Sequence, residues 1–228
     1  MAIPVRLVSY NVHSLRDDLS ALASVVHSLS PDIVVVQEAP RRFRWRQRCA
    51  ALAHSFGLFY AEGGLPSLGN LIMTSLRVRV TDSWSLRYPL TAGRHMRGAA
   101  FARCTIPGPG GSFLVAGTHL STNDSERPEQ AAFLQPQLNA SEDPVILAAD
   151  LNEPDSGQSW RTLVTDLVDT GLGGPNTFPA AAPDRRIDAV FVSPAVKVVS
   201  YEVISGPLAQ RASDHLPIAV DLELPATA

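Results

Sequence analysis

The stretch VILAADLNEPD, residues 145–155, begins as a run of aliphatic side chains and ends in two polar ones, Asp150 and Asn152. The aliphatic run is typical of a strand that is buried on both faces. Such a strand gains nothing from a carboxylate at its end, so Asp150 needs a partner. Residues i and i+2 of a strand share a side. If the extended backbone continues through Leu151, Asp150 and Asn152 face one ligand together.

Other predicted strands also begin or end in polar residues. These strands cover residues 5–12, 32–39, 111–120, 144–150, 187–194 and 216–224, and the polar residues at their ends are Asn11, Glu38, His119, Asp150, Asn152, Asp188, Asp214 and His215. Each residue alone has an ordinary structural explanation, such as a turn cap for Asn11 or a solvated acid for Glu38. Ligands of layered α/β proteins collect at strand ends, so the coincidence of all eight favours a functional site.

The chemistry of this set is informative. It holds four acids, two amides and two histidines, with no cysteine, and the chain has no GxSxG nucleophile motif. Oxygen-rich ligands suit a hard divalent cation such as Mg²⁺ or Mn²⁺. Histidine with carboxylate suits activation of a water molecule, or stabilisation of charge that builds up on a phosphate.

The remaining elements predict one α/β-type domain over residues 1–228. Apolar periodicity predicts helices over residues 15–30, 41–57, 129–140 (weaker, and interrupted by Pro136) and 157–171, and further strands over residues 69–75, 78–86, 97–106 and 196–204. Residues 59–70 cannot be assigned, and residues 173–186 are irregular. No linker, repeat or shift in composition marks a domain boundary.

Composition limits the class of protein. The chain has 228 residues, 45% hydrophobic and 18% charged, which excludes a disordered chain. A net charge of −3 weakens, without excluding, a nucleic-acid partner. Residues 41–49, RRFRWRQRC, hold five arginines around Trp45. This basic stretch either guides a polyanion into a site or is the solvated face of a helix.

We expect a monomeric, cytoplasmic protein. The first residues show no signal peptide, and no segment reaches the roughly 20 apolar residues of a membrane span. Cys49 and Cys104 lie in no CxxC pair, so free thiols in a reducing compartment are favoured over a disulfide or a metal site.

Six stretches in order resemble the endonuclease/exonuclease/phosphatase superfamily, the fold of deoxyribonuclease I, exonuclease-type repair nucleases, neutral sphingomyelinases and inositol polyphosphate 5-phosphatases. They are VSYNVHS, PDIVVVQEAP, GTHLS, LAADLNEPD, RRIDAVFVS and SDHLPIAVDLEL. Singly each is weak, but together they span the chain from residue 8 to residue 224. One departure is Ala149, where the family usually has glycine before the aspartate.

The resemblance implies a four-layered α/β/β/α sandwich, in which two mixed β-sheets pack face to face with helices outside. It also implies cleavage of a phosphate ester with Mg²⁺ or Mn²⁺. Glu38 then resembles the main metal ligand, with Asn11 and Asp214 near the same ion.

The same resemblance assigns the other roles. Asp150 resembles the group that orients or deprotonates the attacking water, and Asn152 should hold a phosphate oxygen. Asp188 and His215 should form a carboxylate–histidine pair. His119 should donate to the phosphate. Arg97 stands where the family often has a phosphate-facing arginine.

The substrate stays open. A phosphodiesterase or nuclease is the first expectation, and a phosphomonoesterase or a phospholipase-type member is the alternative. A binding protein that has kept the fold and lost catalysis is an alternative of another class. The sequence PDRRID, residues 183–188, lacks the WCDR signature of the inositol phosphatases. The intact set of eight polar residues favours an enzyme.

Overall fold

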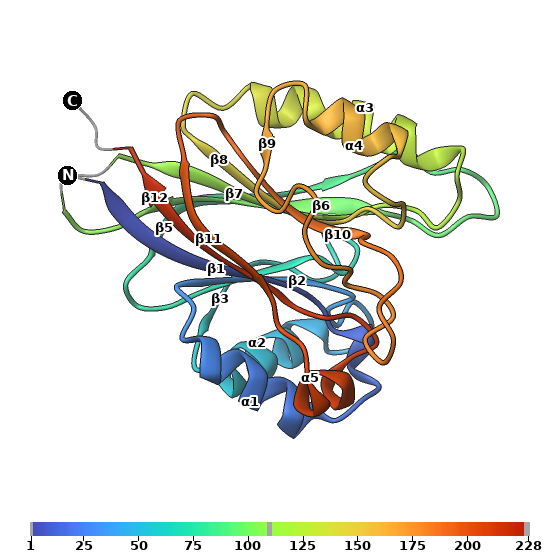
Figure 1. Ribbon diagram of the computed structural model, residues 1–228, viewed down its shortest axis with the longest axis horizontal. Helices are drawn as coiled ribbons and strands as arrows, with labels where there is room; N and C mark the ends of the chain where they lie inside the picture. The colour runs from blue at the N-terminus through green and yellow to red at the C-terminus, as the bar shows by residue number, and fades with distance from the viewer. Residues whose placement is uncertain (1, 109–110, 226–228) are drawn as a thin grey trace.

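The computed structural model describes residues 2–108 and 111–225, and these form two six-stranded mixed sheets (Figure 1). The first sheet has the order β11 (Lys197–Val203), β12 (Ile218–Leu224), β1 (Ile3–Asn11), β2 (Ile33–Gln37), β4 (Leu71–Thr74) and β3 (Phe59–Gly63). The second has the order β5 (Arg79–Arg87), β6 (Gly98–Thr105), β7 (Phe113–His119), β8 (Val145–Asp150), β10 (Asp188–Val192) and β9 (Val168–Asp169).

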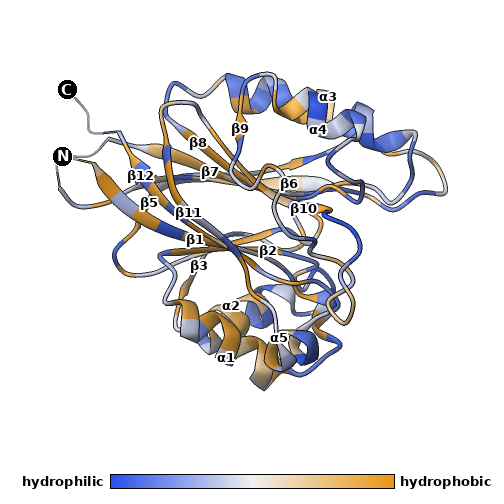
Figure 2. Cartoon of the chain, in the orientation of Figure 1, coloured by the Kyte–Doolittle hydropathy of each residue, from blue (hydrophilic) through white to orange (hydrophobic). Residues whose placement is uncertain are grey.

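Helices cover the outer face of each sheet, so the expected four-layered sandwich is confirmed (Figure 1). The first sheet carries α1 (Leu19–Leu29), α2 (Trp45–Ser55) and α5 (Pro207–Ala212), and the second carries α3 (Glu126–Asn139) and α4 (Gln158–Leu163). A 3-10 turn, η1 (His13–Leu15), follows β1. Figure 2 shows that apolar residues concentrate in the strands between these helical layers.

The layer between the two sheets positions the site. Alternate residues of β1, such as Val5 and Leu7, point into this layer, and Val8 and Tyr10 point outward to the helices. The sheets approach closely at Gly117 of β7, where an added Cβ would lie 2.4 Å from Cγ1 of Val35. Such contacts bury apolar surface, which is the main favourable term in folding.

Two predicted helices differ from the structure. The helix predicted over residues 157–171 ends at Leu163, because Val168 and Asp169 pair with β10 as strand β9 instead. Helix α3 continues through Pro136 without interruption. Its buried residues, including Leu134 and Leu138, pack on the second sheet, and such packing outweighs intrinsic propensity.

Other boundaries and elements also differ. Helix α1 begins at Leu19 because the Asp18 side chain accepts hydrogen bonds from the Ser20 and Ala21 amides. Helix α2 begins at Trp45, after Arg44 adopts the left-handed conformation. The edge strand β3 and the short helix α5 were not predicted, since neither shows a clear periodic pattern.

The two cysteines, Cys49 and Cys104, are buried and free, as predicted. None of the helices in the described residues has the length and apolar character that crossing a membrane requires.

Candidate functional site

Four residues at the ends of neighbouring strands of the second sheet lie in a single row across it. In the strand register, Gly98 of β6 pairs with His119 of β7, His119 with Asp150 of β8, and Asp150 with Asp188 of β10. Strands β7 and β8 are parallel and end at this row, and the antiparallel β10 begins there. The row therefore places His119, Asp150 and Asp188 side by side.

These side chains point into the layer between the sheets. Each follows the alternation of its strand: Ala148 and Ile146 precede Asp150 on the same face, and Val190 and Val192 follow Asp188. The apolar layer thus ends in a polar cluster, at the end of the sandwich opposite the two termini (Figure 1).

Asn11, the last residue of β1, joins this cluster from the first sheet. Its Nδ2 donates to Oδ2 of Asp150 at 2.8 Å, and its Oδ1 accepts from the backbone N–H of His13. The hydroxyl of Ser213 donates to the backbone carbonyl of Asn11 at 2.7 Å. The Asn11 side chain is therefore held in place and buried.

His215 and Asp188 form the carboxylate–histidine pair that the resemblance implied. Nδ1 of His215 lies 2.9 Å from Oδ2 of Asp188, and Thr177 donates a 2.6 Å hydrogen bond to the same oxygen. Burial alone would lower the pKa of His215, but the charges of Asp188, Asp150 and Asp214 and the hydrogen bond to Asp188 raise it to about 10. The ring is therefore an imidazolium at neutral pH, and its Nε2 lies 3.9 Å from Oδ2 of Asp150.

The pKa of His119 is shifted in the opposite direction from that of His215. Burial, together with the charge of Arg97, outweighs the attraction of Asp150 and lowers the pKa of His119 to about 3. Its ring is therefore neutral. Nη1 of Arg97 lies 3.0 Å from Nδ1, and Nε2 lies 3.2 Å from Oδ2 of Asp150. Because a guanidinium only donates, Nδ1 must accept, and the ring proton stays on Nε2, facing Asp150.

Asn152 does not continue the strand, which corrects the expected extended geometry through Leu151. Its φ is +53°, in the left-handed region, and its backbone N–H donates to Oδ1 of Asp150 at 3.0 Å. Its Nδ2 donates to the carbonyl of Leu120 at 3.0 Å and lies 2.7 Å from Nε2 of His119. A tight turn, rather than strand alternation, therefore brings Asn152 to the site.

Glu38 also has a left-handed backbone, with a φ of +58°, directly after β2. Ser14 donates a 2.7 Å hydrogen bond to Oε2 of Glu38. Asp214 lies between α5 and β12 with 37% of its side chain exposed, and its Oδ2 lies 3.7 Å from Nε2 of His13. Both carboxylates are thus accessible, unlike Asp150 and Asp188.

Two groups of residues could hold a divalent cation. Within the described residues, Asp150, Asp188 and His215 are the one trio of His, Cys, Asp or Glu side chains with ligand atoms within 4.8 Å of one another. Nδ1 of His215 is, however, already paired with Asp188, and a protonated ring is not a ligand. The oxygen donors of Glu38 and Asp214 fit Mg²⁺ or Mn²⁺ better.

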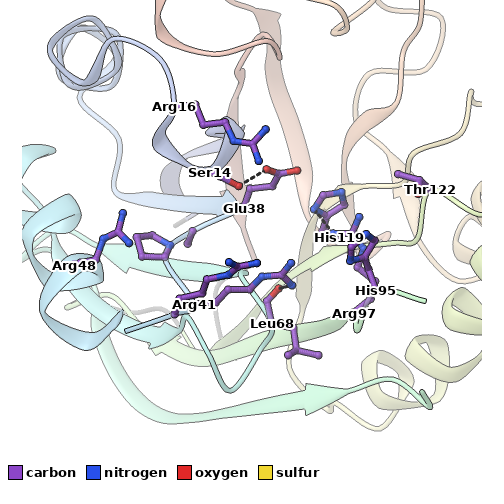
Figure 3. Close-up of a pocket in the computed structure, with 13 residues that line it drawn as sticks. Ser14, Arg16, Glu38, Arg41, Arg48, Leu68, His95, Arg97, His119 and Thr122 are labelled. Atoms are coloured by element: carbon purple, nitrogen blue, oxygen red, sulfur yellow. Dashed lines mark hydrogen bonds between the residues drawn. The ribbon is translucent and has the colours of Figure 1, made fainter. Parts of the chain in front are cut away.

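A cavity of about 550 Å³ opens beside this cluster (Figure 3). Glu38, Arg97 and His119 line this cavity. The His119 ring therefore contacts both the cavity and the buried Asp150. Its wall carries five arginines, namely Arg16, Arg41, Arg42, Arg48 and Arg97, and one carboxylate. The cavity is therefore suited to an anion.

Several supporting residues escaped the sequence analysis. Ser14 holds Glu38, Thr177 holds Asp188, and Phe178 packs on His215 with ring centroids 4.7 Å apart. Thr177 and Phe178 come from the irregular stretch before β10, where no pattern marks a function. Ser14 and Ser213 stand within the stretches VSYNVHS and SDHLPIAVDLEL, and these stretches were the available signals.

The comparisons agree with this architecture. A family model described as the Endonuclease/Exonuclease/phosphatase family matches residues 8–215. No curated protein sequence gives a significant match.

Solved structures match over nearly the whole chain. A family protein from Bacteroides thetaiotaomicron has a TM-score of 0.82 and 19% identity, with 99% of each chain covered. A mannosyl-6-phosphatase from the same species has a TM-score of 0.78 and 20% identity, covering 96% of this chain and 99% of that one. D. rerio TDP2, complexed with a single-strand DNA product, has a TM-score of 0.76 and 20% identity, with 96% and 98% covered. These likenesses show the fold, and the family model, which spans most of the sequence, shows that the chain belongs to the endonuclease/exonuclease/phosphatase family.

Proposed function

We propose that this protein is a divalent-metal-dependent hydrolase of phosphate esters, and in the first place a phosphodiesterase of the nuclease type. One observation carries the proposal. Asp150 is buried and in contact with Asn11, a neutral His119 and a charged His215, and this network opens through His119 into an arginine-lined cavity. Members of the family act on phosphate esters, and the arrangement suits that chemistry.

The donors around His119 support phosphate binding. A neutral imidazole accepts at one nitrogen only, yet both Arg97 and Asn152 place a donor against this ring. With Nδ1 accepting from Arg97, one N–H of Asn152 has no acceptor on the ring. In addition, Nε of Arg97 is buried without a partner in the described part of the chain. A phosphate oxygen would satisfy these donors, which gives Arg97, Asn152 and His119 the role of binding substrate.

The carboxylate of Asp150 would take the proton from the attacking water. The oxygen of that water would bond to phosphorus as the bond from phosphorus to the leaving-group oxygen breaks, and the departing oxygen would take a proton from solvent. The neighbouring imidazolium of His215 stabilises the negative charge of Asp150 in the resting state and can donate its Nε2 proton to an oxygen of the reacting phosphate. Asp188 keeps Nδ1 of His215 protonated and fixes the ring. The Nε2 proton of the neutral His119 faces Asp150 in the resting state, and we expect it to turn to a phosphate oxygen as charge develops there.

Glu38 and Asp214, with Asn11 beside them, would hold the divalent cation. A bound Mg²⁺ or Mn²⁺ would neutralise charge on the phosphate oxygens. The donor chemistry of these residues fits such an ion, and Ser14 keeps the carboxylate of Glu38 oriented.

Two alternative activities are hydrolysis of phosphomonoesters and hydrolysis of lipid phosphodiesters. The similarity to a mannosyl-6-phosphatase favours a phosphomonoesterase, and the similarity to a TDP2 bound to single-strand DNA product favours a nucleic-acid diester. A phospholipase-type activity on lipid diesters belongs to the same chemistry. A single domain, a monomeric state and a cytoplasmic location stay predictions.

The test is hydrolysis of bis(p-nitrophenyl) phosphate and p-nitrophenyl phosphate with Mg²⁺ or Mn²⁺, with and without EDTA. We expect metal-dependent turnover that Asp150→Ala abolishes and that Asp82→Ala, a change at an exposed acid on β5, leaves intact. Absence of metal-dependent turnover of these esters and of every substrate below would instead support a binding protein with this fold. Plasmid DNA, single-stranded DNA, RNA and phospholipid in parallel assays then separate the substrate classes.

A further inference from the structure

The arginines of the cavity are free of carboxylate partners. None of Arg16, Arg41, Arg42, Arg48 and Arg97 has a carboxylate oxygen within 4.0 Å among the described residues. Arginines that do form ion pairs lie elsewhere, namely Arg6, Arg77, Arg103, Arg127, Arg185, Arg186 and Arg211. Unpaired like charges that line one cavity repel one another, and a bound anion offsets that repulsion.

The five arginines are not equally placed. Arg97 contacts His119, and Arg41 is anchored by donating to the carbonyls of Leu68 and Met96. Arg16 comes from the turn before α1, Arg42 from the loop before α2, and Arg48 from the start of α2. In Figure 3, Arg16 and Arg48 stand on the far side of Glu38 from His119 and Arg97.

The negative charge of one scissile phosphate is smaller than the positive charge of the five arginines that line the cavity. A phosphodiester carries about one negative charge and a monoester about two at neutral pH. The cavity offers five guanidinium groups against the single carboxylate of Glu38, and a cation at Glu38 would make it more positive still. Its volume of about 550 Å³ lies within the range of pockets that hold a whole small-molecule ligand.

We propose that the substrate carries a second phosphate, and that Arg16, Arg42 and Arg48 bind it while the scissile phosphate lies at Arg97 and His119. This proposal rests on the phosphoesterase function above and narrows it to phosphate esters with at least one additional phosphate. Arg42 and Arg48 also line a neighbouring hollow with Phe43, whose surface is 87% exposed. Beyond the second phosphate the ligand can therefore place an apolar or aromatic group on Phe43.

The first pair of probes is the p-nitrophenyl ester of thymidine 5′-phosphate, with and without a 3′-phosphate. The second pair, fructose 1,6-bisphosphate and fructose 6-phosphate, is followed by release of phosphate. We expect the added phosphate to raise kcat/KM about tenfold or more in at least one pair, since each charge-assisted contact contributes on that scale. A gain in the first pair indicates a nucleotide or nucleic-acid substrate, and a gain in the second indicates a phosphorylated sugar.

The matched variants are Arg42→Gln/Arg48→Gln and the control Arg46→Gln. Arg46 lies on α2 in the same basic segment, but it stacks over Trp45 and lines neither hollow. The double variant should lose most of the preference for the added phosphate, as a ratio of kcat/KM values, and the control should keep it. A wild-type ratio near one, or an equal loss in the control, overturns the proposal.

A binding measurement tests the site for the second phosphate independently of the phosphoesterase function. If no ester of either pair is hydrolysed, the phosphoesterase function fails. Calorimetric titration with thymidine 3′,5′-bisphosphate and thymidine 5′-phosphate then tests the second phosphate alone. Tighter binding of the bisphosphate, lost in the double variant and kept in Arg46→Gln, supports the site. Equal affinity for the two nucleotides overturns it.

Discussion

Nδ2 of Asn11 donates a 2.8 Å hydrogen bond to Oδ2 of Asp150, and this buried contact joins β1 of the first sheet to β8 of the second. The two residues are 139 positions apart in the chain. Each ends a strand that also supplies apolar residues to the layer between the sheets, namely Val5 and Leu7 in β1 and Ile146 and Ala148 in β8. The site thus forms where the shared core of the two sheets ends, and its geometry depends on how they pack.

Replacement of Asp188 by asparagine should lower kcat while substrate binding stays nearly unchanged. The neutral amide would no longer hold Nδ1 of His215 protonated, and the charge that favours the imidazolium would be lost. In a serine-protease triad, the same change from aspartate to asparagine lowers kcat about 10⁴-fold. Steady-state kinetics with bis(p-nitrophenyl) phosphate measures the effect. The exposed Asp184, changed to asparagine, is the control, and a kcat equal to that of the wild type for Asp188→Asn would contradict the role of the pair.

Glu38→Gln should weaken Mn²⁺ binding about tenfold or more, because it removes one of the two accessible carboxylates but keeps an oxygen for the Ser14 hydroxyl. Calorimetric titration with Mn²⁺ measures the affinity. Glu129→Gln, at an exposed residue near the start of α3, is the matched control. If Asp188→Asn weakened binding and Glu38→Gln did not, the ion would lie at the Asp150, Asp188 and His215 cluster instead.

The apolar pattern predicted one α/β domain and most of the site residues, because buried strands leave a strong apolar signal and their polar ends stand out against it. The four layers were expected from the family resemblance. Asp150, Asp188 and His119 are such residues, and the register places them in one row. The sequence could not predict the turn at Asn152, since its left-handed backbone is stabilised by the bond from its own N–H to Asp150.

Contacts between residues far apart in the chain could also not be predicted from the sequence. The helix predicted through residue 171 fails because Asp169 pairs with the buried Arg186, and that contact favours a strand beside β10. Thr177 supports Asp188 from an irregular segment whose composition says nothing of its role. Gathering of the arginines around the cavity likewise depends on tertiary structure, because Arg97 lies far along the chain from the basic segment.

The low pKa of His119 predicts acid sensitivity of the folded state. Its folded pKa of about 3 lies below the usual 6.5, so the unfolded state binds the proton more tightly. The stabilising contribution is complete above pH 6.5 and is lost as the pH falls toward 3. We expect the free energy of unfolding of the wild type to fall more steeply than that of His119→Gln between pH 6.5 and 4, by up to about 1.4 kcal/mol per pH unit.

Urea denaturation at several pH values in metal-free buffer measures this difference. His54→Gln, which removes a histidine at the exposed end of α2, serves as the control and should follow the wild type. Parallel curves for wild type and His119→Gln would show that His119 is protonated as easily in the folded as in the unfolded chain.

Arg186→Lys should destabilise the fold although it conserves charge. Arg186 is 4% exposed, donates two hydrogen bonds of 2.8 and 2.6 Å to Asp169, and lies over the ring of Trp160 at 4.6 Å. Lysine offers a point charge without the planar fork or the stacking surface, so one carboxylate oxygen would lose its partner. We expect a loss of about 2–3 kcal/mol in the free energy of unfolding.

Urea denaturation measures this loss. Arg79→Lys, on the exposed edge strand β5, is the control and should stay within about 0.5 kcal/mol of the wild type. Equal stability of the two variants would mean that Arg186 contributes only its charge and that β9 is held to β10 by its backbone bonds alone.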